Sequence, residues 1–151
     1  MGRNQQTIGE LIITDKIKVE SGKPVILGAL AFPKTTVTTL TSGATVTYTA
    51  AQVLGGFITD TISAGCAATL PTPASIVAAI PGAAVGTSFD VVIKNTAASA
   101  IAITVTANGA STIVGTATIT QNNSKMFKAI ISNVTPGSEA VAFYSLGMAA
   151  F

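Results

Sequence analysis

The sequence predicts an all-β protein: an antiparallel β-sandwich or jelly-roll-like domain with one or two very short helices and an extended N-terminal arm. Three observations favour this class. Apolar and polar residues alternate along many short segments, as in strands with one buried face. Turn signals separate these segments about every 8–12 residues, a spacing typical of sandwiches and barrels. Threonine, which is β-branched and favours strands, supplies many of the polar positions.

Charged residues are concentrated at the start of the chain and predict its division into two parts. The first 34 residues hold eight of the fourteen charged residues. We therefore expect residues 1–34 to form a charged, strand-like N-terminal arm and residues 35–151 to form the β-sandwich domain. Within the arm, residues 11–14 and 16–20 are typical of short strands. Residues 24–33 are apolar and bounded by prolines, which suits a buried strand or a segment that docks on a neighbouring molecule.

The β-domain begins with three strand-like segments. Residues 35–41 and 44–49 are rich in threonine and flank a turn at Ser42 and Gly43. Residues 57–62 resume the strand pattern after a short interruption. These segments predict the first strands of the domain.

Two segments carry helix-capping signals. Thr49 is placed as the N-cap of a one-turn helix, with Gln52 as its capping-box partner and Gly55 as its stop. Thr72 is the natural N-cap of a second helix, which has proline at its first position and must end before Pro81. Two such short helices leave the predicted fold essentially all-β.

The second half of the domain has clearer strand patterns. In residues 87–95 the apolar side chains at positions 89, 91 and 93 share one face, and Asp90 and Lys94 share the other. Residues 101–107 direct their apolar side chains inward in the same way. Further strands are expected over residues 112–115, 116–120, 125–132 and 140–146.

Turn signals connect these later strands. Asn108-Gly109 is the strongest short-range hairpin signal in the chain. Asn122-Asn123 marks a second turn, and Ser124-Lys125 is interpreted as the exit of a hairpin turn. Pro136-Gly137 suits the central pair of a type II turn. We expect these turns to join antiparallel neighbours.

The composition excludes several kinds of catalytic and metal site. The chain has no histidine and one cysteine, which excludes His-based triads, His/Cys zinc sites and an intrachain disulfide. Cys66 lies in an apolar segment and is interpreted as a small buried hydrophobic residue. Asp15, Asp60 and Asp90 are far apart in the sequence and are interpreted as solvated charges on strand faces or turns. A Ser/Lys dyad stays open, although no serine is singled out.

We accordingly expect no enzyme activity and no catalytic, cofactor-binding or metal-binding residues. Basic residues of the arm are largely offset by acidic ones, so no nucleic-acid partner is expected, although a weak electrostatic partner role for the arm stays open. No apolar stretch suits a membrane span, which needs about 20 residues, and no small-molecule substrate is indicated. Asn122 and Asn133 begin glycosylation sequons, but both lie at turns, where asparagine is common.

The surface of the β-domain is expected to be nearly neutral. Only 9% of the chain is charged, against roughly 25% in an ordinary soluble domain. A surface of Thr, Ser, Ala and Asn fits a protein that buries much of its area against copies of itself or a larger assembly. The alternative is an extracellular β-domain with a neutral face.

Five segments in a fixed order resemble a known class of protein. They cover residues 48–58, 70–80, 86–96, 115–127 and 141–147. Over about residues 44–147 the chain resembles small β-sandwich virion structural proteins, of the capsid cement, decoration or fibre type, from double-stranded DNA viruses and tailed phages. The arm is outside this resemblance.

The resemblance implies a non-enzymatic capsid cement or decoration protein located at the capsid surface of a virion. It further implies a homo-oligomer, with a trimer favoured, that binds the major capsid protein or other virion proteins and has no active-site residues. The alternatives are a fibre or tail protein and a cell-surface adhesion module. A glycan-binding module would have only Tyr48 and Tyr144, with six phenylalanines, available for stacking on sugar rings.

Overall fold

Ten strands and two short helices make up residues 34–150, which are the residues that the computed structural model describes. The large sheet contains β1 (Thr36–Ser42), β3 (Gly56–Ile62), β5 (Ser88–Asn95), β7 (Ser111–Val114), β9 (Asn123–Asn133) and β10 (Ala140–Ala150). The small sheet contains β2 (Thr45–Thr47), β4 (Cys66–Thr69), β6 (Ile103–Thr106) and β8 (Thr118–Ile119). The helices are α1 (Ala50–Leu54) and α2 (Pro73–Ala79). The predicted arm lies outside the described residues, apart from Lys34.

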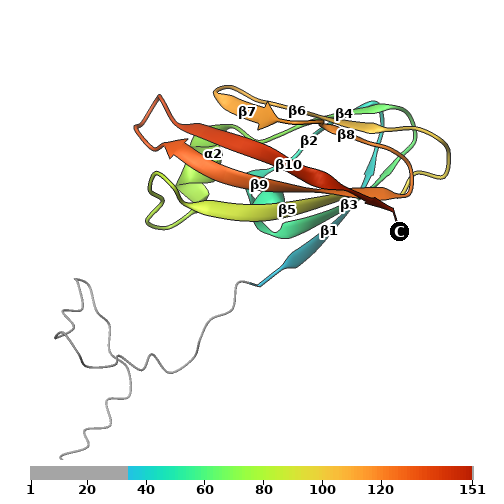
Figure 1. Cartoon of the computed structure of the whole chain (residues 1–151), viewed down its shortest axis with the longest axis horizontal. Coiled ribbons are helices and arrows are strands. Elements are labelled where there is room, and N and C mark those ends of the chain that lie inside the picture. The colour runs from blue at the N-terminus through green and yellow to red at the C-terminus, as the bar shows by residue number, and fades with distance from the viewer. Residues whose placement is uncertain (1–33, 151) are drawn as a thin grey trace, which may run out of the picture. The chain divides into compact units, whose positions relative to one another are not determined.

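The chain alternates between the two sheets from β1 to β6. Figure 1 shows β1, β3, β5, β9 and β10 side by side, and the order of the large sheet is β1-β3-β5-β9-β10-β7. Each of the first strands pairs with the strand two places later in the sequence, after the chain has passed through the other sheet. The chain then runs in its original direction again, so β1, β3 and β5 pair in parallel, as do β2, β4 and β6.

The prediction of antiparallel sheets is wrong for five of the eight strand pairs that residues 34–150 form. The four pairs named above and the β7–β10 pair are parallel, whereas β5–β9, β9–β10 and β6–β8 are antiparallel. The physical reason is that most turns send the chain across to the other sheet instead of back along its neighbour. The fold is mostly β, as predicted, but its sheets are mixed.

Two of the predicted hairpin turns illustrate this difference. Asn108-Gly109 lies between β6 and β7, which belong to different sheets, so no hairpin forms there. A type I′ hairpin turn needs positive φ at both central residues, and only Gly109, at 59°, has it. Asn122 also has positive φ, at 55°, but it joins β8 of the small sheet to β9 of the large one.

The Pro136-Gly137 turn is confirmed. It joins β9 to β10, which are antiparallel neighbours. Gly137 has a φ of 80°, and the amide of Ser138 donates to the carbonyl of Thr135 at 2.9 Å. A positive φ at the third residue and a bond from the fourth residue back to the first are features of a type II turn.

Both predicted helices are confirmed with their caps. The Thr49 hydroxyl accepts the amide of Gln52 at 3.2 Å, and the Gln52 side chain accepts the amide of Thr49 at 2.8 Å. Gly55 ends α1, and the positive φ that reverses the chain falls one residue later, at Gly56. Thr72 caps α2, which ends before Pro81 as expected.

The two sheets contribute to one hydrophobic core. Strands of the large sheet supply Ile58, Ile93 and Phe127, and the small sheet supplies Ile103 and Ile119. All five side chains are almost completely buried. Burial of this apolar surface is the main favourable term for the fold.

Candidate functional site

The sequence-predicted carboxylates occupy two different environments. Asp90 lies on the outer face of β5 and forms an ion pair with Lys128, at 3.1 Å between Nζ and Oδ1. Its interpretation as a solvated charge on a strand face is confirmed. The same interpretation is wrong for Asp60, which is fully buried in β3. Asp15 lies outside the described residues.

Asp60 is the centre of a buried polar cluster. The hydroxyl of Ser42 donates to Asp60 Oδ2 at 2.9 Å, and the phenol of Tyr48 donates to the same oxygen at 3.4 Å. Oδ1 has no hydrogen-bond partner among residues 34–150. The backbone carbonyl of Asp60 accepts the amide of Thr96 at 3.0 Å. The cluster therefore fastens β1 and the segment before α1 to β3.

Burial keeps the neighbours of Asp60 neutral. It raises the pKa of the Tyr48 phenol, and the negative charge of Asp60 raises it further. Burial and Asp60 also raise the pKa of the Cys66 thiol, which makes a reactive thiolate less accessible. The interpretation of Cys66 as a small buried residue is confirmed, because only 2% of it is exposed. These features indicate a structural role for the cluster.

Lys125 defines a different kind of site. The expectation that Ser124-Lys125 forms the exit of a hairpin turn is wrong, because β9 already begins at Asn123. The Lys125 side chain points inward, and only 4% of the residue is exposed. It borders a hollow of about 600 Å³, lined by Gly115, Thr116, Thr118, Thr120, Lys125, Ser145, Gly147 and Met148.

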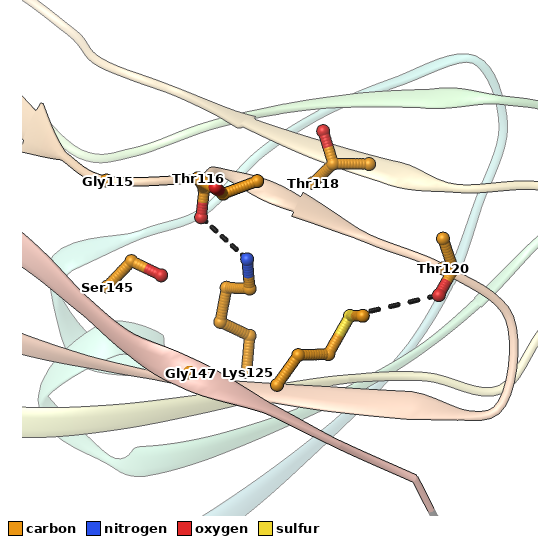
Figure 2. Close-up of a pocket in the computed structure, with 8 residues that line it drawn as sticks. Gly115, Thr116, Thr118, Thr120, Lys125, Ser145 and Gly147 are labelled. Atoms are coloured by element: carbon orange, nitrogen blue, oxygen red, sulfur yellow. Dashed lines mark hydrogen bonds between the residues drawn. The ribbon is translucent and has the colours of Figure 1, made fainter.

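The Lys125 ammonium has one hydrogen-bond partner among residues 34–150. Nζ donates to the carbonyl of Thr116 at 2.6 Å. Figure 2 shows the lysine extending from β9 toward this carbonyl, with Ser145 directed into the same space from β10. Burial lowers the pKa of Lys125, because an ammonium is less stable away from water.

Two glycines shape the rim of this hollow. Gly115 has a φ of 98°, and a Cβ added to it would lie 3.2 Å from Cβ of Ser145. Gly147 has a φ of 116° and lies in an irregularity where the pairing of β10 with β9 shifts between Ser145 and Met148. The glycines thus allow the chain to approach closely at one side and to bulge at the other.

A row of apolar side chains crosses the outer face of the large sheet. The strand register places Val37 beside Phe57, Phe57 beside Val92, and Val92 beside Met126. Leu146 lines the same shallow hollow, of about 260 Å³, as Val92 and Met126. Val37 is 63% exposed and Leu146 is 56% exposed. We call these five residues the outer apolar row.

At the edge of the large sheet beside this row, no second strand of residues 34–150 pairs with the outer side of the edge strand. β1 forms that edge, and its residues 36–42 include no charged residue and no proline. Proteins often protect an edge strand with charge, proline or a bulge. An edge without these features is a ready partner for another strand.

No group of three or more Cys, Asp or Glu side chains that could hold a metal ion occurs in residues 34–150. Within the same residues, no helix is long and apolar enough to span a membrane. Comparison of the chain with protein-family models, with curated proteins and with solved structures finds no match.

Proposed function

We propose that this protein is a non-enzymatic structural component of a virion, a cement or decoration protein that binds an icosahedral shell as a homo-oligomer. The observation that carries the proposal is the outer apolar row. An exposed, contiguous apolar surface is typical of a protein interface. The resemblance of the sequence to β-sandwich virion proteins adds the type of assembly, with the major capsid protein or another virion protein as partner.

We assign a second copy of this chain as the partner that covers the outer apolar row. The charged side chains beside the row on this face are Asp90, Lys94 and Lys128, so two copies can approach without removing many charged groups from water. The Asp90–Lys128 pair on the same face is already neutralised within one chain. Threonine hydroxyls supply most of the remaining polar groups.

The strand directions support a ring, and the resemblance to virion proteins favours a trimer. β1 and β5 run in the same direction, β9 runs opposite to β5, and β10 and β7 run with β5 again. The two edge strands of the large sheet, β1 and β7, therefore point the same way. A head-to-tail contact between β1 of one copy and β7 of the next would be an edge contact in addition to the one that the outer apolar row makes. It keeps all copies in one orientation, as a cyclic oligomer requires.

The layer arrangement belongs to this proposal as well. We assign the two sheets to a β-sandwich because side chains from both join one hydrophobic core. A jelly-roll relationship stays a prediction. A sandwich of this kind leaves the outer face of the large sheet available for the neighbouring copy.

The oligomer is tested by measuring the mass of the full chain by sedimentation or light scattering. We expect an oligomer, and we expect Leu146→Asp to weaken its association by about tenfold or more, because a charge would be buried at the interface. Val85→Asp is the matched control, since Val85 is 65% exposed but lies outside the outer apolar row. A stable monomer at high concentration would contradict the proposal, as would equal effects of the two variants.

Attachment to a shell needs a separate experiment. A gene for a major capsid protein beside the gene for this chain would identify the shell to assemble. We expect the purified chain to co-sediment with those shells and to raise the temperature at which they dissociate. A chain that stays in the supernatant at every concentration would contradict the cement role while leaving the oligomer intact.

The glycan-binding alternative is weakened by the burial of one tyrosine. Tyr48 is 1% exposed and donates its hydroxyl within the Asp60 cluster, so it cannot stack on a sugar ring. Tyr144 is 39% exposed on the outer face of the large sheet. A glycan array in which Tyr144→Ala removes a signal would favour this alternative over the cement role.

A further inference from the structure

The buried ammonium of Lys125 lacks a compensating negative charge. No ion pair of Lys125 occurs among residues 34–150, and the other residues that line the hollow carry no charge. An ammonium has three N–H donors, and the Thr116 carbonyl accepts one of them. Buried charges are ordinarily paired, because an unpaired charge is costly away from water. The remaining donors therefore suit an anionic partner.

The surrounding groups select the type of anion. The hydroxyls of Thr118 and Ser145 border the hollow and have no side-chain hydrogen bond within the described residues. One ammonium with neutral hydroxyls balances a single negative charge. A phosphate group, with up to two charges, is better matched by several cations or a helix N-terminus. The geometry thus favours a monoanion.

We propose that the hollow beside Lys125 binds a carboxylate group, with one oxygen accepting from Nζ and the Ser145 hydroxyl available to the other. This site goes beyond the assembly role and does not depend on it. The volume of about 600 Å³ is within the range of about 300–1,000 Å³ for small-molecule pockets. A carboxylate alone is much smaller than this, so the acid carries further atoms that contact Met148 and the threonines.

The carboxylate group can come from two sources. One is a free organic acid, and the other is the Asp or Glu side chain of a docked protein chain. In both cases the carboxylate neutralises the Lys125 ammonium and gives it the anionic partner that the described residues do not supply. The experiment therefore has one arm for binding and one for the source.

The binding arm titrates the full chain with sodium acetate against sodium chloride at equal ionic strength, with the backbone amides followed by NMR. We expect saturable shifts at residues 115–120 and 145–148 with acetate. Lys125→Met should weaken acetate binding by about tenfold or more, because it removes a charge-assisted hydrogen bond. Lys128→Met is the matched control: it lies on the opposite face of β9, and its acetate titration should equal that of the wild type.

The source arm compares the mass of the full chain and of Lys125→Met with and without acetate. If a carboxylate of a second copy fills the hollow, the variant and acetate both weaken association. If the ligand is a free acid, association is unchanged and only the amide shifts respond. Both results support a carboxylate site.

Other results would overturn the site. They are acetate shifts that do not saturate, shifts that persist at full strength in Lys125→Met, or equal loss in Lys128→Met. Should Lys125→Met fail to fold, Ser145→Ala and a wild-type titration at rising pH replace it. Loss of acetate binding as Lys125 deprotonates supports the site, and binding that is independent of pH contradicts it.

Discussion

Two formally charged side chains, Asp60 and Lys125, are buried within the described residues, and their surroundings differ. Asp60 receives two hydroxyl donors inside the core, from Ser42 and Tyr48. Lys125 has a single carbonyl acceptor and faces a hollow. The first environment stabilises a fixed structure, whereas the second leaves room for a ligand.

Replacing Asp60 should show how much the buried cluster stabilises the fold. We expect Asp60→Ala to lower the free energy of unfolding by about 3 kcal/mol, because each orphaned buried donor costs about 1–3 kcal/mol. Asp90→Ala is the control, since an exposed ion pair contributes about 0–1 kcal/mol. Urea unfolding of both variants measures the difference. Equal small losses would show that the Asp60 contacts contribute little.

Replacing Lys125 should change the pH dependence of stability. The folded-state pKa of Lys125 lies below its ordinary value of 10.5, so between the two values the unfolded chain binds more protons. Stability then rises with pH in that interval. We expect Lys125→Met to be more stable than the wild type at pH 7, with a difference that shrinks as the pH approaches 10.5. Chemical unfolding over this pH range, with Lys128→Met as control, checks the expectation; a constant difference would contradict it.

The alternation of residues along the strands indicates that both charged side chains point inward, although charged residues generally face water. Asp60 lies two residues from Ile58 and from Ile62, so all three share the inner face of the strand. Lys125 has the same relation to Phe127. Strand parity therefore predicts their inward direction, whereas the general preference of charged residues for water predicts the opposite. The hollow itself could not be predicted, because it depends on how β8 and the segment before it lie relative to β9 and β10.

At the scale of elements, the helix caps and the Pro136-Gly137 turn were predicted correctly, whereas the Asn108-Gly109 hairpin and most strand pairings were not. The caps of α1 and α2 and the Pro136-Gly137 turn depend on residues within four positions of one another, and all are confirmed. Strand pairing depends on residues that the chain brings together from a distance. β4 was missed altogether, because alanine-rich segments such as Cys66–Thr69 have weak strand propensity.

Two glycine positions should respond in opposite directions to alanine. Gly43 has ordinary φ and nothing within 4 Å of an added Cβ, so Gly43→Ala should stabilise the protein by about 0.4–1 kcal/mol through the unfolded chain. Gly137 also has free space but a φ of 80°, so Gly137→Ala should destabilise it by about 1–2 kcal/mol. Thermal unfolding of the two variants measures both signs. Equal shifts would show that the β9–β10 turn is not restrained as described.

At the scale of the whole molecule, the charged start of the chain and the nearly neutral remainder suggest separate roles. Every helix and strand that the structure describes lies within residues 36–150. We expect deletion of residues 1–34 to leave the unfolding temperature of the β-domain unchanged within about 4 °C, the shift that about 1 kcal/mol produces in a domain of this size. Differential scanning calorimetry of the two chains measures this.

The same deletion should weaken attachment to shells. A charged segment of 34 residues can add a second contact to that of the domain, and linked contacts bind more tightly than either alone. Co-sedimentation at a series of chain concentrations gives the two affinities. A truncated chain that saturates shells at the same affinity as the full chain would show that this segment is not an anchor.

The winding of the chain between the two sheets also sets the order in which the fold can be completed. From β1 to β6 no strand pairs with the next one along the chain, so each pairing must first close a loop that contains a strand of the other sheet. Loop closure lowers the entropy of the chain before the strand contacts form and offset this cost, so it slows folding. During synthesis, however, β3 to β6 each emerge after the strand with which they pair, so these pairings can form in chain order. β7 is the exception, because it pairs only with β10. The large sheet therefore stays incomplete until β10 emerges and pairs with both β9 and β7.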